Sequence, residues 1–315
     1  MKKNLIKLAV SFGILIILLL YIDKLYMDKE REEDSKRLFS SFTEQAQKIS
    51  FEIENNEKFS FERREKGWMM IEPKSFYCEN SRVDPLINQL KTLTYNQELK
   101  KNIDADFSFG LDNPYMKVEV SGKEKEYEII FGEKTYDNRN YYMEINSSPD
   151  SIFIVSSYIV SMFNPDVYYY KSRNILEDSK NEIDKIEVSS DEMNFTINFN
   201  PDGAEFNLQK NGEEVEFDEE AALRIMDDLR FLRAERWIDV DNAGLDFDFT
   251  EPLYTVKIYS NNEQKVILII EPGSEVYGKL TDSTEIFVLP GFITRELENI
   301  EAVNGEPVKD EAVNK

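Results

Sequence analysis

The chain has 315 residues, of which 41% are hydrophobic and 32% are charged. This length and composition allow about two ordinary domains, each with its own core, and exclude a chain that is disordered throughout. Lys and Arg number 38 against 62 Asp and Glu, a net charge of −24, so nucleic acid and anionic lipid headgroups are poor partners for most of the surface.

The N-terminus predicts a membrane helix. An uncharged run extends from Leu8 to Ile22, and Lys7 can extend its charged end to the headgroups, which lengthens the apolar stretch. We therefore expect a stub over residues 1–4 and a transmembrane helix over residues 5–22. Because no small-residue cleavage site follows the run, this helix is expected to remain as a signal anchor.

The charges beside this helix do not set its orientation, because basic residues are equally numerous on both sides of it. A short basic stub before an apolar run resembles an export signal, and long domains cross the membrane largely regardless of their charge. We expect a single-pass protein of the cell membrane with a cytoplasmic N-terminus and an extracytoplasmic body.

Residues 23–48 are rich in charge and carry apolar residues at helical spacing, which predicts a helical stalk. After the stalk, one constant spacing relates two halves of the chain. It matches Gly110 with Gly244 and, further on, Phe153 with Phe287. An ordered match of several strand and turn signals indicates a duplicated module.

The duplication defines the expected domains. They are a first repeat module over 49–165, a linker over 166–182, a second repeat module over 183–300 and a disordered acidic tail over 301–315. The three adjacent tyrosines at 168–170 are costly to leave in water, so we expect them to be buried against both modules.

Within each module, alternating apolar residues predict an antiparallel meander followed by one helix. In the first module Asp84 is the expected N-cap of this helix and Pro85 its first residue, and in the second the helix follows Asp218. The predicted fold class is α+β, with an N-terminal transmembrane helix followed by two tandem repeated modules of mainly antiparallel sheet and covering helices.

A repeated Gly-Leu-Asp turn is the most specific local motif, and we interpret it as architecture. Gly accepts positive φ, Leu fills the core, Asp caps the turn and Pro precedes the next strand. The predicted turn residues are Gly110, Leu111, Asp112, Pro114, Gly244, Leu245, Asp246 and Pro252.

Motifs that would carry chemistry are incomplete. Residues 273–280 fit a phosphate loop except that Leu280 replaces the hydroxyl that holds magnesium, and residues 239–250 lack the final Glu of a calcium loop. Weak calcium binding by scattered acids is the alternative to a solvated acidic loop. With no His in the chain and one Cys, Cys78, which we expect to be inert, no catalytic, cofactor or metal residue is predicted, and no cofactor.

Several motifs together resemble one bacterial family. They are Gly67-Trp68 in a strand running into Pro73, the helix from Asp84 to Leu93, the Gly110-Leu111-Asp112-x-Pro114 turn, Arg173-x-Ile175-Leu176 and the second copy. The pattern is similar to the domain of unknown function 4340 family. That family has no established activity, so the resemblance carries over no catalytic residue. It implies an envelope protein often encoded beside gliding-type ABC transporter genes.

The sequence thus predicts a non-enzymatic, membrane-anchored extracytoplasmic scaffold or accessory protein. The resemblance implies a partner, the membrane subunit of an ABC-type (gliding-type) transporter or another envelope protein, and nucleic acid is not expected to bind. One alternative is a module that binds an extracellular ligand or a wall polysaccharide, and another is a carboxylate-based hydrolase.

Overall fold

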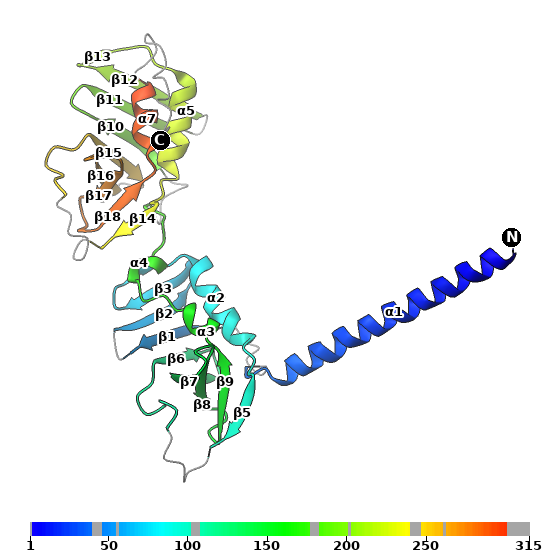
Figure 1. The fold of residues 1–315 in the computed structure, drawn as a ribbon. Coiled ribbons are helices and arrows are strands. Elements are labelled where there is room, and N and C mark those ends of the chain that lie inside the picture. The colour runs from blue at the N-terminus through cyan, green and yellow to red at the C-terminus, as the bar shows by residue number, and fades with distance from the viewer. Residues whose placement is uncertain are drawn as a thin grey trace. The chain divides into compact units, whose positions relative to one another are not determined.

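The computed structural model describes residues 2–39, 46–54, 57–101, 108–176, 183–200, 203–239, 247–260 and 263–300. Side chains of the N-terminal helix are described from Leu15 onward, apart from positions 17, 30 and 32. The chain divides into two compact units, Met1–Tyr170 and Lys171–Lys315, and each contains a nine-stranded antiparallel sheet with a few helices (Figure 1). The prediction of tandem modules of mainly antiparallel sheet is confirmed.

The first unit begins with α1 (Lys2–Ser35) and continues into its sheet. Its strands are β1 (Lys48–Ile53), β2 (Lys58–Arg64), β3 (Gly67–Glu72), β4 (Phe76–Tyr77), β5 (Gln97–Lys100), β6 (Met116–Ser121), β7 (Glu126–Lys134), β8 (Asn140–Ile145) and β9 (Ser151–Ser156). Its other helices are α2 (Asn80–Lys91), α3 (Tyr158–Ser161) and α4 (Val167–Tyr170). The strand order is β4-β3-β2-β1-β6-β7-β8-β9-β5.

The second unit repeats this plan. Its strands are β10 (Ile183–Ser189), β11 (Met193–Asn200), β12 (Gly203–Lys210), β13 (Glu213–Glu214), β14 (Arg236–Ile238), β15 (Tyr254–Ser260), β16 (Glu263–Ile270), β17 (Val276–Leu280) and β18 (Ile286–Leu289). Its helices are α5 (Glu219–Arg230) and α7 (Phe292–Ile300). The strand order, β13-β12-β11-β10-β15-β16-β17-β18-β14, places each strand where its counterpart lies in the first sheet. The predicted duplication is confirmed.

The spacing between equivalent residues changes along the modules. Phe153 in β9 and Phe287 in β18 are matched at the spacing seen in the sequence. From these two residues, the cross-strand pairs of each sheet identify the equivalent residues in the neighbouring strands. Met116 then corresponds to Tyr254, which is a slightly wider spacing. The same registers equate strand β1 with β10. A register shift between Phe131 and Lys134 in β7, absent from the β16–β17 pair, and turns of different length account for the changed spacing.

Alternation of apolar and polar residues builds both cores. In β6 the pattern of buried and exposed side chains alternates along the strand, so one sheet face is covered and the other is open to solvent. Helix α2 joins the edge strand β4 to the opposite edge strand β5 and therefore crosses the sheet, as α5 does between β13 and β14. In the second unit α5 and α7 lie side by side (Figure 1). Each fully buried large apolar side chain contributes about 1.5–3 kcal/mol.

Tyr170 closes the core of the first unit. Its side chain is fully buried, its ring centroid lies 4.9 Å from that of Phe61, and its hydroxyl accepts a hydrogen bond from the Asn164 N–H at 2.9 Å. Burial raises the pKa of this phenol. The expectation that all three tyrosines are buried is wrong, because Tyr168 and Tyr169 are only half-buried and Tyr170 packs in the core of the first unit.

The N-cap prediction for α2 is wrong. The helix begins five residues earlier, at Asn80, and Pro85 lies inside it. Asp84 Oδ1 instead accepts hydrogen bonds from Trp68 Nε1 at 2.8 Å and from Arg63 Nη2 at 2.9 Å. A buried indole N–H needs a hydrogen-bond acceptor, and the Asp84 carboxylate is that acceptor for Trp68. In α5, by contrast, Asp218 caps the helix by accepting from the N–H groups of Glu220 and Ala221.

The helix expected as a stalk over residues 23–48 ends at Ser35 in the structure. Beyond it the chain turns onto the end of α2, where the Leu38 N–H donates to the Leu93 carbonyl at 3.1 Å. Phe39 is buried with its ring edge-on to Tyr127 at 5.2 Å. Leu38 and Phe39, which follow the helix, therefore pack in the core of the first unit.

Among the described residues, no helix is both long enough and apolar enough to cross a membrane.

The turn at Gly110 packs tightly against β7. Gly110 has φ of +70°, and a Cβ on it would lie 2.3 Å from Glu133 Cγ and 2.7 Å from Glu133 N. The Glu133 N–H donates to the Phe109 carbonyl at 2.8 Å, which holds the two segments together. Leu111 is half-buried, not fully buried as expected. The second predicted turn, Gly244-Leu245-Asp246, lies outside the described residues, as does the tail over 301–315.

Gly110→Ala should therefore lower the free energy of unfolding by about 1–3 kcal/mol, through left-handed backbone strain and the clash with Glu133. Gly273→Ala is the matched control, because nothing lies within 4 Å of its added Cβ, and it should change stability by less than about 0.5 kcal/mol. Calorimetric melts of the two variants measure the difference. Equal stability of the two variants would contradict the packing described for this turn.

Candidate functional site

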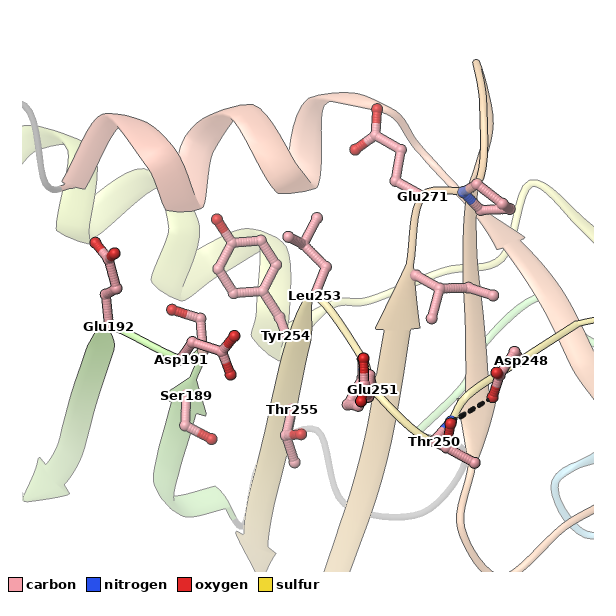
Figure 2. Close-up of a pocket in the computed structure, with 14 residues that line it drawn as sticks. Ser189, Asp191, Glu192, Asp248, Thr250, Glu251, Leu253, Tyr254, Thr255 and Glu271 are labelled. Carbon is pink, nitrogen blue, oxygen red and sulfur yellow. Dashed lines mark hydrogen bonds between the residues drawn. The ribbon is translucent and has the colours of Figure 1, made fainter.

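An open depression lies at one end of the second sheet, where β10 ends, β15 begins and β16 ends (Figure 2). Its volume is about 1110 Å³. The residues that line it are 189–192, 248, 250–255 and 270–272. It is thus built by strands that are far apart in the sequence and neighbours in the sheet, together with the segments that enter and leave them.

A tight turn and two prolines end the strands at this depression. After β10 the chain reverses within a tight turn, in which the Ser190 N–H donates to the Met193 carbonyl at 2.9 Å. Pro252 precedes β15 and Pro272 follows β16, and neither residue has an N–H that could extend the ladder. The hydrogen-bonded ladder therefore stops at the ends of these central strands, where the depression lies.

The lining of this depression is acidic. Five exposed carboxylates belong to it, and none of the described lining residues is basic. The five are Asp191, Glu192, Asp248, Glu251 and Glu271. Figure 2 shows these side chains spread around the strand ends, with Leu253 and Tyr254 among them. Such a surface suits cationic groups.

Asp248 is held by its neighbour Thr250. Asp248 Oδ1 accepts hydrogen bonds from Thr250 Oγ1 at 2.7 Å and from the Thr250 N–H at 2.9 Å (Figure 2). These bonds, the hydroxyl first, hold the pKa of Asp248 below its usual value, because they favour the charged form. Asp248 therefore stays ionised at a lower pH than a free aspartate does.

A second depression lies at the equivalent place in the first unit. It has a volume of about 740 Å³ and is lined by residues 54, 113–115, 132–134 and 141. The strand registers equate Met116 with Tyr254 and Phe131 with Ile269. The same spacing, continued two residues beyond these pairs, matches Pro114 with Pro252 and Glu133 with Glu271. Every lining position except Tyr141 has a counterpart that lines the second-unit depression. The depression is therefore duplicated with the module.

Ring contacts support this correspondence before β6 and β15. The rings of Phe109 and Tyr142 lie 4.6 Å apart, and those of Phe247 and Tyr277 lie 4.8 Å apart. The spacing that equates the two prolines before these strands also equates Phe109 with Phe247. At this spacing Asp248 corresponds to Gly110, whereas the constant spacing in the sequence had matched Gly110 with Gly244.

The two depressions differ in charge and filling. The first contains Glu54 and Glu133 together with a basic residue, Lys134, whose Nζ lies 5.5 Å from the ring centroid of Tyr141. The ring of Tyr115 lies 5.3 Å from that of Tyr141, and burial raises the pKa of Tyr141 to about 12. A tyrosine pair and a lysine thus occupy part of this hollow.

Of the residues that the sequence singled out, Pro114 and Pro252 line the two depressions, whereas Leu111 and Asp112 line neither. Sequence reasoning missed the paired acids: Glu133 lies near the end of β7, and Glu271 directly follows β16. The two residues lie at the ends of equivalent strands, β7 and β16, but this equivalence becomes visible only from the strand registers.

The phosphate-loop-like and calcium-loop-like segments form no phosphate loop or metal site among the described residues. Residues 273–280 lead into β17 and not into a helix. Most of the calcium-like loop lies outside the described residues, and within the described part of the chain no three acidic or Cys side chains are grouped to hold a metal ion. Cys78 is buried, and its Sγ lies 3.9 Å from the Phe76 carbonyl oxygen.

A family model described as "Domain of unknown function (DUF4340)" matches residues 68–252. The match begins at Trp68 in β3, runs through the first unit and ends at Pro252 in the second-unit depression. It covers more than half of the chain. A comparison with curated proteins finds no match.

Thr250→Val should raise the pKa of Asp248 toward its ordinary value, because the variant loses the hydroxyl donor and keeps only the backbone donor. The lowered pKa favours the folded, ionised form above the unfolded-state pKa, and this contribution disappears as the pH falls through the folded-state pKa. Carboxyl ¹³C NMR titration of the parent chain and the variant measures the change.

Asp137 is the internal control for this titration. Its pKa is lowered in the same way, first by the Thr135 hydroxyl and then by the Arg139 N–H, and Thr250→Val should leave it unchanged. Identical titration of Asp248 with and without the Thr250 hydroxyl would show that this hydrogen bond does not set its pKa.

Proposed function

The chain belongs to the domain of unknown function 4340 family, and from that membership we propose that it is a non-enzymatic, membrane-anchored scaffold or accessory protein that binds a partner outside the cytoplasm. The observation that carries the proposal is the duplicated depression, since the same strand ends form an open surface in both modules. Small-molecule sites usually enclose most of their ligand. An open, repeated hollow suits a macromolecular partner.

The anchor is the first part of this proposal. The described side chains of α1 from Leu15 to Met27 include ten exposed large apolar residues, and none of the described α1 side chains is buried. A helix that is apolar all round is unstable in water and stable in a bilayer. The uncharged run begins at Leu8, ahead of the described side chains. We place the membrane span over residues 5–22, with the N-terminus in the cytoplasm and the body outside.

The partner is the second part. Family resemblance supports an ABC-type (gliding-type) transporter, with its membrane subunit or another envelope protein as the direct contact. Acidic modules fit this role, because a net charge of −24 keeps them from anionic headgroups and leaves their depressions available to proteins.

The chemistry of the depression favours binding over the alternatives. A carboxylate-based hydrolase needs one acid whose pKa is raised. The pKa of Asp248 in the depression is lowered, and Asp228, whose pKa is raised by burial, lies in α5 and does not line the depression. Binding of a wall polysaccharide usually uses an exposed aromatic ring face, and Tyr254, the aromatic residue in the second-unit lining, is only 5% exposed. Neither alternative gains support from these groups.

Extraction of membranes in mild detergent tests the proposal. The full chain should stay in membranes washed with high salt, keep Met1 to Lys24 in its mature form, and be digested from outside in spheroplasts. Affinity purification should then recover a subunit of an ABC transporter. A variant lacking residues 2–22 should lose both the membrane retention and the stable complex.

Loss of the N-terminal residues in the mature protein would contradict the anchor, and protection of the body until lysis would contradict its orientation. An eluate without any ABC subunit, from membranes that contain the full chain, would contradict the transporter partnership.

A further inference from the structure

We propose that the second-unit depression binds an extended, basic segment of a partner protein, and that the first-unit depression is a smaller, less acidic copy of the same hollow that does not bind it. This inference deepens the proposed function and rests on it. Three observations carry it: the difference in charge between the two hollows, the position of one exposed leucine, and the narrowing of the first hollow by tyrosines.

Charge separates the two sites. Five carboxylates without a basic neighbour in the described lining give the second-unit depression a formal charge of −5. Glu54, Glu133 and Lys134 give the first-unit depression a charge of −1. Because the two hollows are formed by equivalent strand ends, the fold itself does not require this accumulation of acids. Asp248 adds to it at the position where the first unit has Gly110.

Leu253 gives the acidic hollow an apolar centre. Its side chain is 42% exposed and lies among the carboxylates, beside Tyr254 (Figure 2). Lys and Arg side chains combine an aliphatic stem with a charged end, so a basic peptide can cover Leu253 with its stems while its charged ends reach the carboxylates. An inorganic cation would leave the leucine uncovered.

The equivalent position in the first unit is partly covered by a neighbouring ring. Tyr115 corresponds to Leu253, and it is only half-buried but packs 5.3 Å from the ring of Tyr141. The counterpart of Tyr141 is Val276, which is buried and does not line the second-unit depression. Tyr141 thus narrows the hollow to about 740 Å³ in the first unit, and the smaller, buried Val276 leaves about 1110 Å³ in the second.

The spread of the acids favours a polypeptide over a single ion. The carboxylates come from three separate strand ends and surround the hollow (Figure 2). Among the described residues they form no group that could hold a metal ion. Separate charges around a hollow of about 1110 Å³ match the repeated charges of an extended peptide.

Binding of a basic peptide to the full chain in detergent micelles tests this inference. The probe is a short fluorescein-labelled peptide of alternating Lys and Ser, measured by anisotropy at low salt. The double variant Glu251→Gln/Glu271→Gln should bind it about tenfold more weakly, as expected for the loss of two partly exposed charge pairs. Leu253→Ser, which keeps every charge, should weaken binding by a few-fold.

Two matched variants separate a specific site from general attraction by an acidic protein. Glu213→Gln/Glu214→Gln removes the same charge from the exposed strand β13, and Glu54→Gln/Glu133→Gln removes it from the first-unit depression. Both should bind the probe within about twofold of the unchanged protein. All substituted acids are exposed, so the variants should keep the melting temperature of the parent chain.

Equal weakening by all three double variants would overturn the inference in favour of diffuse electrostatics. An unchanged affinity in Glu251→Gln/Glu271→Gln would overturn it as well. A glucosamine oligomer that binds the same site more tightly than the peptide would replace the protein partner with a saccharide. If the transporter subunit co-purifies but the peptide does not bind, the inference fails and the proposed function stands. If the peptide binds without such a subunit, the reverse holds.

Discussion

Each unit depends on one long-range strand pair, β1 with β6 and β10 with β15. These pairs bring together residues that are far apart in the chain, such as Phe51 and Val118, or Val188 and Val256. They join a meander that precedes the crossing helix to a meander that follows it, so each unit has one continuous sheet. Closing so long a loop costs entropy, which the buried alternating side chains must offset. In the first unit Glu119 adds to this joint by accepting a hydrogen bond from the Ser50 hydroxyl.

The depressions are a consequence of this pairing. In each antiparallel pair the first strand ends where the second begins, β1 beside β6 and β10 beside β15, and the chain turns away from the sheet there. Pro114 and Pro252, which precede β6 and β15, stop the hydrogen-bond ladder at this end. The duplication therefore copies a hollow along with the sheet. The two copies then differ through their side chains, with Tyr115 and Lys134 in one and Leu253 and Pro272 in the other. An architectural feature has thus become a candidate binding surface in one unit.

Local patterns predicted the elements well and the long-range details poorly. Alternation identified the meanders, and helical spacing of apolar residues placed the start of α5 at Asp218, which caps the helix in the structure. Asp84 has the same capping chemistry, but its carboxylate serves Trp68 across the sheet, which no local pattern reveals. A constant spacing in the sequence detected the duplication, yet the equivalence of Glu133 with Glu271 needed the strand registers. The site could not be predicted because it consists of strand ends that only pairing brings together.

Hydrogen exchange of the full chain in lipid nanodiscs, with and without the Lys-Ser peptide, tests the central claim most directly. The account predicts slower exchange in the peptide complex at residues 189–192, 250–255 and 270–272, the lining of the second-unit depression. Exchange at the equivalent residues 113–115 and 132–134 should stay unchanged. Protection of both depressions to the same extent, or of neither, would contradict the claim that one copy of a duplicated hollow is the binding site.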